Sequence, residues 1–177
     1  MEEAKFSHTG SIGDVIASIP AMKQYHKTTG RKIVLHLISG VPAHYYEGAT
    51  HPTKNSDGEM VMLNSQVIEM MKPLFLAQDF IEDVVESTID VPDSVRLHAI
   101  RESFVGMPSF SINRWYFYVF PDLACDLSVP WLQVPDAETD FAKGKIIITR
   151  TERYQNGADY SFLKPYEDNL IFSGTLS

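Results

Sequence analysis

Residues 5–22 run KFSHTGSIGDVIASIPAM, which predicts a short strand, a tight glycine loop and the opening of a helix. Gly10 and Gly13 allow a backbone conformation, or a close approach of backbone to ligand, that a side chain would block. The apolar residues after the loop recur at helical spacing and predict a buried stripe: Val15, Ile16, Ile19 and Met22. A strand, a glycine loop and a helix in this order typically open an α/β sheet that receives its ligands at the loop.

A second strand follows this helix within a short distance. Gly30 is suited to the left-handed conformation that ends a helix, and residues 32–38 (KIVLHLI) form a nearly continuous apolar run. Such a run is typical of a parallel strand that is covered on both faces. Strand, helix and strand within about 35 residues predict a βαβ unit with a right-handed crossover. The fold class predicted is therefore α/β, a Rossmann-like three-layer sandwich with a mostly parallel sheet.

The remaining elements are predicted from shorter patterns. We expect strands at residues 59–63, 81–85, 145–149 and 169–174, and helices at residues 65–71, 73–78, 93–105 and 112–120. Prolines and acidic residues dominate residues 121–140, a composition typical of an interdomain connection. The sequence thus predicts one domain over residues 1–140 and the beginning of an incomplete second Rossmann-like domain over residues 141–177.

Composition excludes several classes of protein. The formal net charge of -8 argues against nucleic acid as a partner, because phosphate binding requires a basic face. Cys125 is the single cysteine, which rules out an internal disulfide framework and fits a reducing compartment. The first residues do not resemble a signal peptide, and no apolar run is long enough to span a bilayer, so we expect a cytoplasmic protein without stable membrane insertion.

The glycine loop differs from the common nucleotide-binding loops. A dinucleotide fingerprint needs three glycines and an acidic residue after the second strand, whereas this loop has Gly10 and Gly13 and the second strand is followed by Ser39 and Gly40. The loop also lacks the lysine of a P-loop. The spacing of His44 and His51 matches no metal motif. We therefore expect no cofactor and no metal.

Asp14 has two interpretations. Its position at the predicted start of the helix suits a helix cap, which aspartate performs well. A carboxylate beside a ligand-binding loop also suits a general base. His8, at the end of the first strand, either lines the same site or packs in the interior. Together with Gly10, Ser11 and Gly13, these residues form the candidate acceptor or phosphate loop.

Arg150 and Arg153 directly follow an apolar strand. Two guanidinium groups in that position are suited to grip a diphosphate or a carboxylate through paired hydrogen bonds. The alternative is a solvated loop in which Glu152 is the local partner. Both interpretations remain open at this point.

The segment GSIGDV (10–15), followed by IPA (19–21), resembles the opening of the heptosyltransferase-like glycosyltransferases. The resemblance implies the GT-B architecture, in which an amino-terminal Rossmann-like half receives the carbohydrate acceptor and a carboxy-terminal half binds a nucleotide-sugar donor. It implies that Asp14 is the catalytic base that deprotonates the acceptor hydroxyl. It also places Arg150 and Arg153 near the donor phosphates.

The family's proteins are considerably longer than this chain. The resemblance therefore predicts the amino-terminal, acceptor-binding part of an inverting glycosyltransferase, either a fragment of a longer reading frame or a half that has lost catalysis. An apolar face left by the absent half would favour a homodimer. The alternative is a non-catalytic Rossmann-like module for small-molecule binding or interaction, in which Asp14 is only a helix cap.

Overall fold

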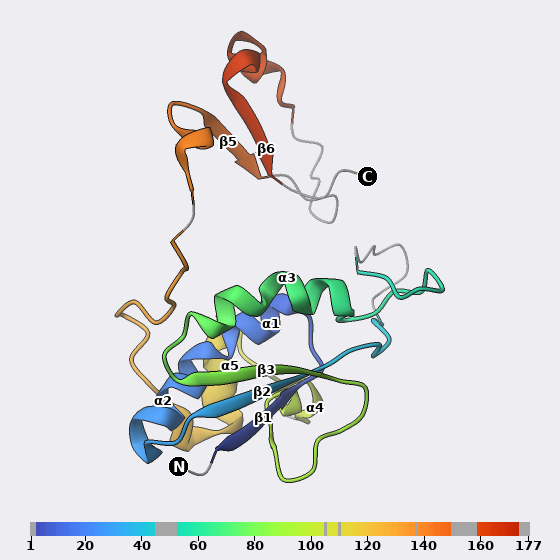
Figure 1. Ribbon diagram of the computed structural model, residues 1–177, viewed down its shortest axis with the longest axis vertical. Coiled ribbons are helices and arrows are strands. Elements are labelled where there is room, and N and C mark those ends of the chain that lie inside the picture. Colours follow the sequence, from blue (N-terminus) through green and yellow to red (C-terminus); the bar gives the residue numbers. More distant parts are fainter. Residues whose placement is uncertain are drawn as a thin grey trace. The chain divides into compact units, whose positions relative to one another are not determined.

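The computed structural model describes residues 3–44, 53–104, 106–109, 111–136, 138–149 and 159–173 (Figure 1). The chain divides into two compact units, the first made of Met1–Ala43 with Thr53–Pro135 and the second containing Asp136–Ser177. The first unit is a Rossmann-like α/β sandwich, with a four-stranded parallel sheet flanked by helices. The predicted fold class is confirmed.

The sheet of the first unit contains β1 (Ala4–His8), β2 (Ile33–Ile38), β3 (Ile81–Ser87) and β4 (Val95–Arg96). Its order is β3-β2-β1-β4, and every neighbouring pair is parallel. The chain moves outward from β1 through β2 to β3 and then returns to the other side of β1. The strand order therefore reverses between β1 and β4, and such a switch point is where open α/β sheets bind ligands, at the carboxyl ends of the strands.

Two helices, α1 (Ile12–Ala17) and α2 (Ile19–Thr29), connect β1 to β2 where the sequence pattern predicted one. Pro20 has no N–H to donate to the preceding turn. The N–H of Ala21 bonds the carbonyl of Ser18 at 3.0 Å, which leaves the Ala17 carbonyl to accept from the Asn113 amide at 2.8 Å. Helix α2 ends at Gly30 with φ 71°, as predicted.

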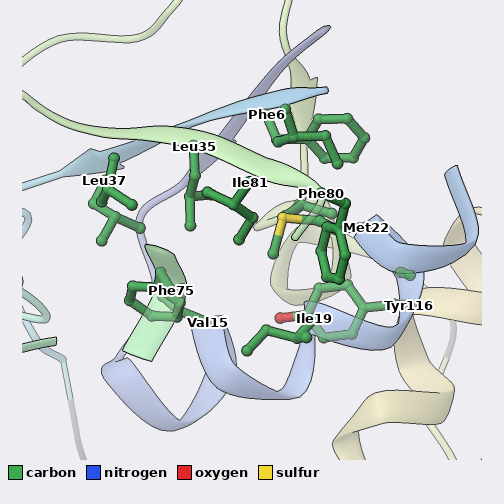
Figure 2. Close-up of a cluster of buried hydrophobic side chains, with 14 of the residues drawn as sticks. Phe6, Val15, Ile19, Met22, Leu35, Leu37, Phe75, Phe80, Ile81 and Tyr116 are labelled. Atoms are coloured by element: carbon green, nitrogen blue, oxygen red, sulfur yellow. The ribbon is translucent and has the colours of Figure 1, made fainter. Parts of the chain in front are cut away.

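A single apolar core lies between the sheet and the helices. Figure 2 shows Leu35, Leu37 and Ile81 of the sheet facing Val15 and Ile19 of α1 and α2. Helices α3 (Ser65–Leu76) and α5 (Ile112–Val119) complete the enclosure with the fully buried side chains of Ile68, Phe75 and Tyr116. At about 25 cal/mol per Å² of buried apolar area, this core is the main source of the unit's stability.

The opposite face of the sheet is less covered than the apolar run of β2 predicted. Val34 and His36 are only partly buried, and Lys5 is exposed. Hydrogen bonds between polar side chains occupy this face: the hydroxyls of Ser7 and Ser94 lie 2.8 Å apart, and His36 Nδ1 lies 3.3 Å from the Ser87 hydroxyl. Polar pairs therefore contribute to the packing on this face of the sheet.

Several element predictions hold and two are wrong. The helices at residues 65–78 merge into α3, with Pro73 inside it, and the aromatic run forms α5 as predicted. Residues 59–63 contribute only isolated bridges, Pro42 to Val61 and Lys54 to Met60, rather than a strand. The helix predicted at residues 93–105 is instead the short strand β4 followed by the four-residue helix α4 (Ala99–Glu102), because Asp93, with φ 57°, turns the chain away from a helical path.

The second unit is smaller. Its strands β5 (Ile146–Thr149) and β6 (Leu170–Ser173) form a parallel pair, so the strands predicted there are confirmed. Two 3₁₀ segments accompany them, η2 (Asp140–Ala142) and η4 (Ser161–Asn169), while η1 (Pro121–Leu123) follows α5 in the first unit. Across the described residues, no helix has both the length and the apolarity needed to cross a membrane.

Candidate ligand site at the carboxyl ends of β1 and β4

The predicted loop lies at the switch point of the sheet. His8 is the last residue of β1, Gly10 and Ser11 form the turn, and α1 begins at Ile12. On the other side of the switch point, the chain leaves β4 at Arg96 and enters α4 at Ala99. Two loops from neighbouring parallel strands therefore meet at one edge of the sheet.

An ion pair joins α1 and α4, the two helices that follow these loops. Arg101 of α4 donates to both carboxylate oxygens of Asp14, from Nη2 to Oδ1 at 2.6 Å and from Nε to Oδ2 at 3.3 Å. The Asp14 side chain is only 7% exposed, whereas the Arg101 side chain is 48% exposed. The guanidinium also lies 5.0 Å from the ring centroid of Trp115 and makes a cation–π contact with that ring. The paired geometry and the stacked ring fix the orientation of the guanidinium.

Asp14 is not the N-cap of its helix. Ser11 occupies the N-cap position without a side-chain cap bond. Asp14 follows three residues later, in the first turn of α1. Its carboxylate is directed to Arg101 instead of to the backbone N–H groups of the turn. The capping interpretation is therefore wrong in its geometry, although a negative charge in the first turn still interacts favourably with the helix dipole.

A buried series of hydrogen bonds, called here the hydrogen-bonded chain, supports the loop from the interior of the unit. His8 Nδ1 accepts from the backbone N–H of Gly10 at 2.8 Å, and His8 Nε2 lies 2.7 Å from the Tyr116 hydroxyl. The same hydroxyl donates to the backbone carbonyl of Asp14 at 2.7 Å. Because this hydroxyl has one proton and gives it to Asp14, it must accept from His8, which places the imidazole proton on Nε2.

Burial keeps both members of this chain uncharged. Desolvation is the main cause that lowers the pKa of His8 from 6.5 to about 3, followed by the electrostatic effects of the neighbouring His98 and Arg101. Desolvation, together with the Asp14 charge, raises the pKa of Tyr116. Of the two interpretations of His8, the geometry favours a packed histidine that positions the loop.

Gly10 and Gly13 serve different purposes in this loop. A Cβ on Gly10 would lie 2.5 Å from His8 Cε1 and 2.9 Å from Asp14 Oδ2, so a side chain there would collide with the imidazole and cover the carboxylate. A Cβ on Gly13 would meet nothing closer than the Ser11 hydroxyl at 4.0 Å. Gly10 is thus required by packing, while Gly13 leaves open space at the start of α1.

The arrangement offers two chemical functions. A guanidinium carries five N–H donors, and two of those on Arg101 bind Asp14, so its half-exposed side chain retains donors for an acceptor group on a ligand. The Asp14 carboxylate is an acceptor whose Oδ2 is held more loosely than Oδ1. Within the described residues, no group of three or more His, Cys, Asp or Glu side chains is suited to a metal ion.

The structure brings together most of the residues that the sequence singled out: Asp14, His8, Gly10, Ser11 and Gly13 share this loop. Arg150 and Arg153 lie outside the described residues. Sequence reasoning missed Arg101, because β4 is too short to show a strand pattern. It also missed Tyr116, whose place in an aromatic run indicated only core packing.

His98 also went unrecognised. Its ring lies 6.4 Å from that of His8 and is almost fully buried.

Comparison with family models, with curated proteins and with solved structures finds no match for this chain.

Proposed function

We propose that this chain is the acceptor-binding part of an inverting glycosyltransferase of GT-B architecture that uses a nucleotide-sugar donor. The observation that supports this best is the position of the loop from Gly10 to Asp14 at the switch point between β1 and β4. Ligands of open α/β sheets bind at such points. The resemblance of GSIGDV (10–15) to the heptosyltransferase-like opening supplies the reaction class.

In the proposed reaction, a hydroxyl of the acceptor attacks the anomeric carbon of the donor sugar. A new C–O bond forms with inversion, the bond from the anomeric carbon to the diphosphate breaks, and the hydroxyl proton passes to Asp14. Oδ2 is the favoured proton acceptor, because its contact with Arg101 is 3.3 Å compared with 2.6 Å for Oδ1. Gly10 supports this assignment, since any side chain at that position would stand 2.9 Å from Oδ2.

Arg101 has a positioning role in this proposal. Its hold on Oδ1 fixes the carboxylate plane, and its remaining donors are available to the acceptor. His8 does not exchange protons, since burial holds the pKa of its imidazole at about 3. Its neutral ring instead fixes the Gly10 amide, and Tyr116 fixes the first turn of α1.

A transfer assay tests the proposal. The chain is incubated with a panel of nucleotide-sugars and a mixture of carbohydrate acceptors, and release of nucleoside diphosphate is measured. We expect Asp14→Asn to lower turnover by about 10²–10⁴-fold, as for loss of a general base. Asp126→Asn, which changes an exposed acid of the same unit, should leave turnover unaltered.

A binding measurement covers the case of a chain that binds acceptors without turnover. Amide resonances of Gly10 and Gly13 are followed by NMR while the same carbohydrates are added, and we expect shifts that Arg101→Ala weakens. Turnover that survives Asp14→Asn would overturn the proposal. So would a folded chain that neither releases nucleoside diphosphate nor binds any carbohydrate of the panel at this loop.

A second candidate function is a non-catalytic small-molecule binding module. One observation favours it: the Asp14 carboxylate is 7% exposed and already satisfied by two hydrogen bonds from Arg101. In this case Asp14 serves the structure, and Asp14→Asn should lower stability without changing ligand affinity. A thermal melt measured beside the binding titration separates the two functions.

A further inference from the structure

A cavity of about 660 Å³ lies beside α4, and neither Asp14 nor Arg101 is among the described residues that line it. It is formed by α4, by the segment 106–108 and by the end of α5. Pockets for small organic ligands typically measure about 300–1,000 Å³. The lining residues are Ala99, Glu102, Ser103, Gly106, Met107, Pro108, Tyr118 and Val119.

The wall of this cavity is mainly apolar, with Met107, Pro108 and Val119 as its larger aliphatic members. Tyr118 adds an aromatic ring that is 59% exposed. Pro108 is fixed in place because its carbonyl accepts a hydrogen bond from the Trp115 indole at 3.0 Å. The cavity is therefore suited to a compact apolar body of about the size of one or two rings.

Negative charge collects at the rim. Among the described lining residues, Glu102 is the one that is charged. Its Oε1 lies 3.2 Å from Arg96 Nη2, but Arg96 also lies 3.7 Å from the Asp90 carboxylate. Two carboxylates therefore share one guanidinium. His98 Nε2 accepts a hydrogen bond from Arg96 Nε at 3.2 Å, so this nitrogen carries no proton and the ring is neutral. Burial, followed by the Arg96 charge, lowers the pKa of His98 in agreement with this geometry. The group carries one net negative charge.

The end of α5 adds to this field. Tyr118 and Val119 are its last two residues, and its last turn contains no basic side chain. The carboxyl end of a helix carries partial negative charge that favours a cation. The face of the Tyr118 ring attracts a cation in the same way. Arg101, the basic residue of α4, is already paired with Asp14.

We propose that this cavity binds a small organic cation, a protonated amine attached to an apolar or aromatic body. The body fills the space between Met107, Pro108 and Val119, and the ammonium group lies at the rim near Glu102 and Tyr118. This assignment does not depend on the proposed transferase function, because none of its lining residues takes part in that reaction.

Three indole compounds of similar size test the proposal at pH 7. Tryptamine is cationic, tryptophol is neutral and indole-3-propionate is anionic. Binding is measured by NMR titration of the amides of Ala99, Met107 and Val119. We expect tryptamine to bind most tightly and indole-3-propionate least, with shifts centred on those amides.

Substitutions identify the source of the selectivity. Glu102→Gln should weaken tryptamine about fivefold, as for a partly exposed ion pair, and leave tryptophol unchanged. Tyr118→Leu should weaken tryptamine further through loss of the cation–π contact. Asp126→Asn is the matched control, since Asp126 is an exposed acid lining a neighbouring hollow that also includes Tyr118.

Three results would overturn the proposal: equal affinity for all three compounds, no binding of any of them, or shifts confined to other parts of the chain. The proposal would also be overturned if both Glu102→Gln and Tyr118→Leu still bound tryptamine more tightly than the neutral and anionic compounds. The transferase proposal fails by different readouts, namely turnover and the amides of Gly10 and Gly13.

Discussion

The strand pairs β1–β2 and β5–β6 have the same geometry and very different surroundings. Both are parallel pairs in regular register, and all four strands were predicted from the sequence. The pair β1–β2 has neighbours on both edges and lies against a closed core. In β5, by contrast, Ile147 is 56% exposed, and Phe162 in the following segment is 67% exposed.

The connecting segments account for this difference. Between β1 and β2, helices α1 and α2 place Val15, Ile19 and Met22 on one buried stripe. The described part of the β5–β6 connection is η4, a 3₁₀ segment with Pro165 inside it and no buried residue. A parallel pair needs a covering layer on its faces, and an amphipathic α-helix supplies one where a 3₁₀ segment does not.

The largest effect is expected from the core of the first pair. Leu35→Ala removes a fully buried side chain from β2 and should lower the free energy of unfolding by about 2–5 kcal/mol. The matched change in the second pair, Ile147→Ala, should alter it by less than about 0.5 kcal/mol, because that side chain is already exposed. Urea denaturation followed by circular dichroism, which reports the backbone of both units, measures both. Equal losses would contradict the contrast.

Acid should destabilise the first unit through His8. Its folded pKa of about 3 lies below its ordinary value of 6.5, so the unfolded chain binds the proton more tightly. The stabilising contribution is complete above about pH 6.5 and is lost as the pH falls toward 3, by about 1.4 kcal/mol per pH unit, or about 3 kcal/mol at pH 4. His98, whose pKa is also lowered, acts in the same direction.

Unfolding curves between pH 7 and pH 4 measure this dependence, with His44→Gln as a control for an exposed histidine. His8→Gln should flatten the curve. If that variant does not fold, the ring resonances of His8 in the unaltered chain give the answer. They should not titrate above pH 4, and titration near pH 6.5 would refute the burial argument.

The two glycines of the loop should respond in opposite directions. Gly10→Ala introduces a methyl 2.5 Å from the His8 ring and should cost about 1–3 kcal/mol, the usual range for overpacking. Gly13→Ala lies in open space inside α1 and should stabilise the unit by up to about 1 kcal/mol. Thermal melts of the two variants compare them directly. A Gly10→Ala variant with an unchanged melting temperature would mean that the loop does not pack on His8.

One oxygen atom in the buried hydrogen-bonded chain carries a further part of the stability. Tyr116→Phe removes the hydroxyl that links His8 to Asp14 and leaves the buried Nε2–H of His8 without a partner, a cost of about 1–3 kcal/mol. The Asp14 carbonyl keeps its hydrogen bond from the Ser18 N–H at 3.1 Å. Tyr118→Phe, on the exposed side of the same helix, is the control and should be neutral. Chemical denaturation distinguishes the two, and equal effects would contradict the hydrogen-bonded chain.

The sequence was sufficient wherever a pattern is long and local. The βαβ unit, the helix stop at Gly30 and the grouping of His8, Gly10 and Asp14 followed from residues close together in the chain. The missing part of the site came from distant residues. Arg101 is 87 positions from Asp14, and it enters through a two-residue strand that has no period to detect.

The break between α1 and α2 illustrates a second limit of prediction from local sequence patterns. Pro20 was visible in the sequence and fits the opening of a helix as well as a kink. Asn113, which binds the freed carbonyl of Ala17, lies 96 positions away. The helical spacing of the apolar residues was correct, but the interruption depended on a partner that no local pattern indicates.

The link from His8 to Tyr116 has a consequence for the order of folding. It spans 108 positions, whereas the contacts that pair β1 with β2 span about 30. Long-range contacts form late, because closing a longer loop costs more chain entropy. The sheet can therefore nucleate while the loop from Gly10 to Asp14 is still unsupported, and this loop acquires its final shape only when α5 docks. Ligand binding at Gly10 would then report completion of the whole unit, and a ligand there would stabilise α5 as strongly as β1.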